Sequence, residues 1–169
     1  MRKTSLFIVV SCCAFALAVL AFAQAHRKPG LWEITSKMTW QQSPFPANMP
    51  AGATAAMSAP HTAQVCVTQE MIDKYGGPLP QSRNNECQAE NVKMSAHGMT
   101  ADWVCNGSMK GKGTVESSWT DEDHSTSKVH FTGTMQMGPQ PKDVEWTSDS
   151  TSTYKGADCG SVKPVPMPK

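Results

Sequence analysis

Few side chains in this sequence are spaced as catalytic chemistry requires. The segment from Gly107 to Thr114 is rich in glycine and lysine, like a phosphate-binding loop. Three residues instead of four separate Gly107 from Gly111, however, and Gly113 rather than a hydroxyl residue follows Lys112. The chain also contains no G-x-S-x-G nucleophile elbow. We therefore interpret the glycine-rich segment as a turn between strands.

Three acidic residues are adjacent in one short stretch, Asp121-Glu122-Asp123. General acid–base catalysis needs a carboxyl group that is desolvated, whereas acids in a turn are normally exposed. The spacing of calcium-binding loops is absent as well. We expect no catalytic residue and predict that the protein is not an enzyme.

A copper site is the one metal centre that the residue types suggest. Cleavage after Ala25 would make His26 the N-terminal residue, which can chelate copper through its amine and its ring when a second histidine is near. Ten methionines after residue 25 could add soft ligands for Cu(I). The candidates for the second histidine are His61, His97, His124 and His130. The simpler reading is that cleavage merely exposes a histidine, so we expect no metal or cofactor and keep copper binding as an alternative.

The tryptophans are the best indication of a binding site. All five fall on predicted inward faces of strands, and they are accompanied by many methionines and only two leucines and two isoleucines after residue 25. Such side chains could line a pocket for an apolar small molecule, although the simpler reading is that they form the core of a small sheet. The candidate pocket residues are Trp32, Trp40, Trp103, Trp119 and Trp146.

The first 25 residues have the features of a cleaved signal peptide. Arg2 and Lys3 precede an apolar run over 6–22, and Ala23-Gln24-Ala25 is a suitable cleavage site. We therefore predict a single exported β domain over 26–169, periplasmic or secreted, without stable membrane insertion after cleavage.

Four cysteines follow the signal segment: Cys66, Cys87, Cys105 and Cys159. An even number in an exported chain predicts two structural disulfides, and no pair has zinc-site spacing.

The pairing depends on the strand register. A two-residue turn at His97-Gly98 places Glu90 opposite Cys105 and turns Cys87 to the other face, which disfavours a bridge between Cys87 and Cys105. Two pairings remain open. We prefer Cys66–Cys87 with Cys105–Cys159, which closes a local loop, over Cys66–Cys105 with Cys87–Cys159.

Composition argues for strands and against nucleic acid as a partner. The formal net charge is +1 for the 169 residues, and it becomes −1 once Arg2 and Lys3 are removed. Serine, threonine and valine are abundant, as in β proteins.

Residues 31–40 alternate as a half-buried strand does, with the even-numbered residues from Trp32 to Trp40 on one face. An uncharged, low-complexity loop is expected over 41–64. Thr68 then offers an N-cap for one short helix through Tyr75, which Gly76-Gly77-Pro78 ends.

From residue 87 onward the chain is typical of a meander. The predicted fold class is all-β and mainly antiparallel, a curved meander sheet or open barrel with one short helix and two disulfides.

The order of several short motifs resembles a known family. Pro29-Gly30-Leu31-Trp32-Glu33 opens the domain, Cys66-Val67-Thr68 precedes the helix, Cys87 and Cys105 lie in the middle, and Tyr154 with Gly156-Ala157-Asp158-Cys159-Gly160 closes it. This set resembles the bacterial domain of unknown function 3617, a family of small exported proteins. The resemblance implies an envelope or secreted location in Gram-negative bacteria and a disulfide-bearing β domain. It implies no activity, substrate or catalytic residue.

Three hypotheses about function follow. We favour an exported envelope protein that binds an apolar small molecule or an envelope component without catalysis. The first alternative is a protein interaction module that docks through the 41–64 segment. The second is copper binding through His26. The oligomeric state is not predicted.

Overall fold

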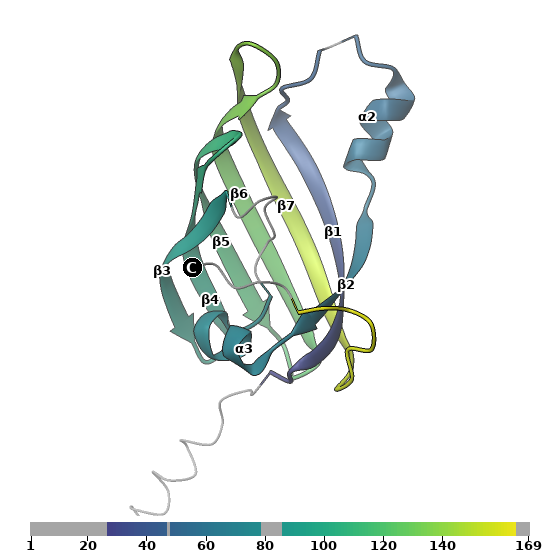
Figure 1. Cartoon of the computed structure of the whole chain (residues 1–169), viewed down its shortest axis with the longest axis vertical. Helices are drawn as coiled ribbons and strands as arrows, with labels where there is room; N and C mark the ends of the chain where they lie inside the picture. The colour runs from purple at the N-terminus through teal and green to yellow at the C-terminus, as the bar shows by residue number, and fades with distance from the viewer. Residues whose placement is uncertain (1–26, 47, 79–85, 165–169) are drawn as a thin grey trace, which may run out of the picture.

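The computed structural model describes residues 27–46, 48–78 and 86–164. The predicted signal peptide and His26 lie outside these residues. Seven strands form one antiparallel sheet in the order β2-β1-β7-β6-β5-β4-β3 (Figure 1). Their bounds are Gly30–Gln42 (β1), His61–Val67 (β2), Cys87–Ser95 (β3), Gly98–Asn106 (β4), Met109–Trp119 (β5), His124–Gln136 (β6) and Pro141–Gly156 (β7). The predicted antiparallel β fold is confirmed.

The topology is a meander closed back upon the N-terminal strand. Strands β3 to β7 follow one another through short turns, and β1 then pairs with the outer side of β7. The sheet curves so that its two edge strands, β2 and β3, lie on opposite sides of a concave face, as Figure 1 shows. Strand alternation directs every second side chain to that face.

The concave face holds two separate hydrophobic clusters. The larger one involves β3 to β7 and includes Phe131, Trp103 and Trp146, while the smaller one is formed by Trp32, Val67 and Met71. The rings of Phe131 and Trp146 stack with their centroids 5.5 Å apart. Burial of these large side chains supplies the main driving force for folding.

The predicted helix is confirmed as α3, Gln69–Tyr75. The hydroxyl of Thr68 accepts a hydrogen bond of 3.2 Å from the amide of Met71, and Gly76 ends the helix in the left-handed conformation with φ of 68°. Met71 and Tyr75 are buried, so the helix closes one end of the concave face.

The expectation that 41–64 is a loop is wrong, and α3 is not the sole helix. Strand β1 extends to Gln42, a second helix α2 spans Ala51–Ser58, and β2 begins at His61. The alanine content that made the segment look like low complexity also favours a helix. Helix α2 stands beside β1 at the end of the sheet opposite α3 (Figure 1).

The expected disulfide pairing is also wrong. The structure contains Cys66–Cys159 and Cys87–Cys105, the second being the pair that the sequence disfavoured. The β3–β4 turn lies at Ala96-His97 rather than one residue later, and Gly98 begins β4.

A β-bulge in β3 completes the change of register. Asn91 has a φ of 52°, and the pairing shifts between Glu90 and Lys93. The Asn91 side-chain amide donates to Asp102 across the strands at 2.7 Å. The bulge and the turn together place Cys87 directly opposite Cys105, with a Cα–Cα distance of 4.0 Å.

Candidate ligand-binding site

A cavity of about 350 Å³ lies on the concave face where β2, β1, β7 and β6 meet. Its apolar lining comes from Ile34, Met38, Val65, Val129 and Trp146. The volume lies within the range of roughly 300–1,000 Å³ that is typical of small-molecule sites. The two hydrophobic clusters are therefore separated by a space that their side chains do not fill.

Serine hydroxyls line the middle of this cavity. One row of paired positions crosses four strands and consists of Ser36, Ser150, Ser127 and Ser117. The hydroxyls of Ser36 and Ser150 share a hydrogen bond of 2.8 Å, and Ser117 donates to Ser127 at 3.0 Å. Ser36, Ser127 and Ser150 of this row line the cavity, as do Ser148 and Ser152 next to it. We call these residues, together with Ser125, the serine band. These paired hydroxyls are half-buried. Because a hydroxyl has one donor and two acceptor positions, the band can still form hydrogen bonds with a ligand.

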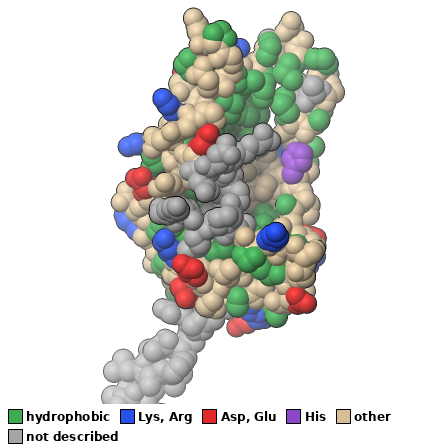
Figure 2. Space-filling model, viewed as in Figure 1, with side chains coloured by type: hydrophobic (Ala, Val, Ile, Leu, Met, Phe, Trp, Pro, Cys, Tyr) green, Lys and Arg blue, Asp and Glu red, His purple; other side chains and the backbone are tan. Residues whose placement is uncertain are grey.

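A second cavity of about 510 Å³ lies between the end of β1 and α2. Met38 lines both cavities, so the two are neighbours. Trp40, Phe45, Met49 and Met57 supply most of the apolar lining of the second cavity. Figure 2 shows hydrophobic side chains gathered in the hollow between the sheet and α2. The Nε1 atom of Trp40 is buried and lacks a hydrogen-bond partner among the described residues.

The five tryptophans predicted to form a pocket are divided between cavity and core. Trp146 lines the first cavity and Trp40 the second. Trp32, Trp103 and Trp119 are buried in the hydrophobic clusters or against them. All five project from the concave face of the sheet, but the structure does not bring them together around one space.

A buried arginine lies at the end of the concave face that α3 closes. Only 6% of Arg27 is exposed. Its guanidinium donates hydrogen bonds of 2.9 Å to the carbonyl of Gly76 and to the hydroxyl of Ser125. It also lies over the ring of Trp32, with Cζ 4.3 Å from the ring centroid. Burial lowers the pKa of Arg27 to about 10, which leaves the group charged at neutral pH.

No carboxylate forms an ion pair with Arg27 among the described residues. The neighbouring acids Glu122 and Asp123 lie 3.2 and 3.1 Å from the ammonium group of Lys28 instead. The Nε atom of Arg27 is buried without a partner in the described part of the chain. Buried charges are normally paired, so this arginine is an unusual feature of the site.

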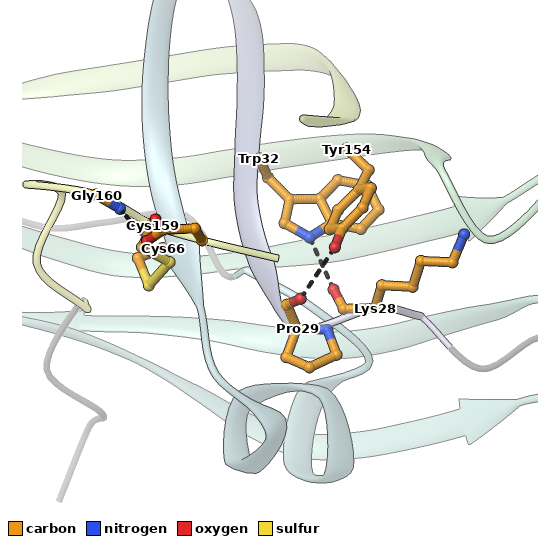
Figure 3. Close-up of a disulfide and its surroundings, with 8 residues drawn as sticks. Lys28, Pro29, Trp32, Cys66, Tyr154, Cys159 and Gly160 are labelled. Atoms are coloured by element: carbon orange, nitrogen blue, oxygen red, sulfur yellow. Dashed lines mark hydrogen bonds between the residues drawn. A yellow bond between two sulfur atoms is a disulfide. The ribbon is translucent and has the colours of Figure 1, made fainter. Parts of the chain in front are cut away.

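The segment that carries Arg27 is held firmly to the sheet (Figure 3). Nε1 of Trp32 donates to the carbonyl of Lys28 at 3.0 Å, and the Tyr154 hydroxyl donates to the carbonyl of Pro29 at 3.5 Å. The Cys66–Cys159 disulfide lies beside these contacts and joins β2 to the segment after β7. These contacts position the arginine at the base of the concave face.

The described residues do not assemble a metal centre. No group of three or more His, Cys, Asp or Glu side chains converges within 27–46, 48–78 and 86–164. The copper hypothesis rests on His26, which lies outside these ranges. Neither helix in the described part of the chain has the length and apolar character needed to cross a bilayer.

The acidic stretch at 121–123 forms the β5–β6 turn. The carboxylate of Asp121 accepts hydrogen bonds from the amides of Asp123 and His124, and these contacts hold its pKa below the ordinary value. At this turn Asp121 therefore accepts hydrogen bonds from the backbone, while Glu122 and Asp123 pair with Lys28.

Sequence reasoning missed the serine band and Arg27. The alternation of β7 contained the signal, since Ser148, Ser150 and Ser152 follow Trp146 on the inward face where apolar residues would be expected. The burial of Arg27 left no such signal, because it depends on contacts with Gly76 and Ser125, which are remote in sequence.

Comparison with known proteins identifies one family. The model of the family described as Protein of unknown function (DUF3617) matches residues 27–159. No curated protein and no solved structure matches the chain.

Proposed function

The chain belongs to the DUF3617 family, and we propose that it is an exported protein that binds an apolar small molecule on the concave face of its sheet without chemical change. The observation that carries this proposal is the pair of neighbouring cavities that share Met38. Together they extend from the serine band to the methionine and aromatic side chains beside α2. Burial of a ligand's apolar surface there would supply the binding free energy.

The character of the lining supports binding in preference to mere core packing. A close-packed core would be expected to cover the concave face over β1, β7 and β6 with branched aliphatic side chains. The chain instead places serines at the centre of the face and flexible methionines at one end. Methionine adapts its shape readily and recurs on surfaces that accept varied apolar partners.

The two disulfides support the export part of the proposal. Disulfides persist in oxidising compartments and are rare in the cytosol. All four cysteines after residue 25 are consumed in bridges. The predicted signal peptide over 1–25 agrees with the same location.

The participation of α2 favours the ligand hypothesis over docking through 41–64. Met57 and Ser58 of α2, with Phe45 and Met49 before it, form one wall of the second cavity. The segment therefore presents apolar side chains toward the sheet, as the wall of a pocket does.

Two adjacent positions of β7 offer a matched test. Ser150 points into the first cavity, whereas Thr151 is exposed on the opposite face. Ser150→Phe should fill the cavity and weaken binding of the uncharged dye N-phenyl-1-naphthylamine at least about tenfold, as expected when a site of this size is blocked. Thr151→Phe should leave binding unchanged.

The measurement is a fluorescence titration of the mature, oxidised protein, with circular dichroism to show that both variants are folded. Saturable binding that only Ser150→Phe weakens would support the proposal. Absence of saturable binding to the wild type, or equal binding to a folded Ser150→Phe variant, would refute it.

A further inference from the structure

Resting on the proposed function, we infer that the ligand is an amphiphile with an acidic head group, bound with its head toward Arg27 and its tail toward α2. The inference comes from the order of polarity along the concave face. Apolar side chains lie at the α2 end, hydroxyls and His61 in the middle, and a buried cation at the α3 end.

The α2 end suits a hydrocarbon tail. The second cavity is lined by Trp40, Phe45 and three methionines, and Met38 continues this lining into the first cavity. Lys37 is the one charged residue among the lining residues, and it is exposed. Transfer of each methylene group of a tail from water into this lining favours binding.

The serine band forms the polar continuation of the same space. Ser150 and Ser152 of β7, Ser36 of β1 and Ser127 of β6 all line the first cavity. Hydroxyls both donate and accept hydrogen bonds, so they can solvate a head group that enters the sheet interior. A ligand that was apolar throughout would leave the remaining hydrogen-bonding positions of these hydroxyls unused.

Arg27 does not itself line that cavity, but it lies behind the lining residues at the α3 end. Three of the residues that contact it are each next to a cavity-lining residue. Ser125 pairs across the strands with Ser152, and Trp32 pairs with Val65. The guanidinium also packs against Gly77, where a β-carbon would collide with it, and Pro78 follows Gly77 in the cavity wall.

The positive charge of Arg27 indicates which kind of head group the site would bind. The partners of the guanidinium among the described residues are a carbonyl, a hydroxyl and aromatic rings, all of them neutral. A desolvated cation with neutral partners attracts an anion strongly, because the low local dielectric constant weakens screening. Guanidinium groups hydrogen-bond carboxylates and phosphates alike, so the shared chemistry is an acidic oxygen head.

Head-group variation at constant chain length tests the inference. Dodecanoate, dodecyl phosphate and dodecanol compete with N-phenyl-1-naphthylamine at pH 8, below their aggregation concentrations. At least one acid should bind the wild type about tenfold more tightly than dodecanol, the factor that one charge-assisted hydrogen bond supplies. The comparison of the two acids distinguishes a carboxylate ligand from a phosphate ligand.

Two cation variants test the orientation. Arg27→Met should lower the affinity for the acids more than the affinity for dodecanol and so abolish the preference for acids. Lys37→Met, the matched control at the α2 end, should keep the preference. Arg27→Lys should keep part of the preference for acids. If Arg27→Met fails to fold, the preference of Arg27→Lys is compared with that of the wild type instead.

Several outcomes would overturn the inference. Equal affinity of the wild type for dodecanol and both acids would exclude an acidic head group, and the proposed function would still stand if Ser150→Phe weakened all of them. Loss of the preference in Lys37→Met but not in Arg27→Met would place the head at the α2 end. Absence of binding by any amphiphile or dye would instead refute the proposed function itself.

Discussion

Trp32 and Trp40 lie on the same face of β1, at opposite ends of the concave side of the sheet. Trp32 is completely buried, and its indole N–H donates to the carbonyl of Lys28 at 3.0 Å. Trp40 is half-buried, its Nε1 has no partner among the described residues, and its ring lines a cavity of about 510 Å³. Trp32 is thus wholly part of a packed core, whereas Trp40 both packs against the larger hydrophobic cluster and lines a cavity.

The two ends differ because their covering elements differ. At the closed end, α3 has a side-chain N-cap and a left-handed glycine C-cap, and it buries Met71 and Tyr75 against the sheet. At the open end, α2 has no side-chain cap, and its N-cap position is Pro50. The closed end is consequently stabilised by contacts within the chain, while apolar side chains at the open end line a cavity.

The largest expected effect comes from the disulfide at the closed end. Cys66–Cys159 spans 93 residues of sequence and Cys87–Cys105 only 18. The loop-entropy model therefore predicts that replacing the first pair by serine lowers the free energy of unfolding by about 4–5 kcal/mol, against about 3 kcal/mol for the second. Chemical denaturation of the two double variants measures the difference. If the short-loop variant proved the less stable, local packing rather than loop closure would dominate.

The tryptophan pair gives the next largest effect and tests the comparison directly. Trp32→Ala should lower the free energy of unfolding by about 3–5 kcal/mol, because a large cavity opens in a packed cluster. Trp40→Ala should cost less than about 2 kcal/mol, since the residue is only half-buried, yet it should weaken dye binding. Urea unfolding and the fluorescence titration distinguish the two. Equal losses of stability without a change in binding would show that both ends are core.

The smallest effect concerns the turns at the two ends. Hydrogen bonds from the amide and hydroxyl of Ser108 to the carboxylate of Glu86 hold the pKa of that group below its ordinary value, as the amides of Asp123 and His124 do for Asp121. A lowered pKa contributes stability that is present above the unfolded value, about 4, and is lost as pH falls through the folded value.

Asp121→Asn and Glu86→Gln should therefore each reduce the loss of stability on acidification from about pH 5 to pH 2. Thermal unfolding across that range measures the change. If the variants lose as much stability as the wild type between about pH 5 and pH 2, these turn contacts do not contribute to the pH dependence of stability. Since both carboxylates are exposed, the effect should be small compared with that of either tryptophan.

Much of the fold follows from local patterns. The alternation over 31–40 predicts β1, and the Thr68 cap with Gly76 predicts α3, because both depend on residues close together in sequence. The number of disulfides follows from the cysteine count. Helix α2 was missed because its alanines were judged by composition instead of helix propensity.

Disulfide pairing could not be obtained in the same way. It depends on the exact register between β3 and β4, and a bulge at Asn91 together with a turn one residue earlier changes every pair in the hairpin. The left-handed backbone conformation of one asparagine is not revealed by the alternation of apolar and polar residues.

The sequence by itself determined an antiparallel β protein with inward tryptophans, a capped helix and two disulfides, since these features arise from neighbouring residues. Only the tertiary structure decided that four serines from β1, β7, β6 and β5 form one row, that Arg27 is buried beside them, and that Trp32 and Trp40 have different environments. The physical reason is that these arrangements depend on register and curvature, which bring together residues that are distant along the chain.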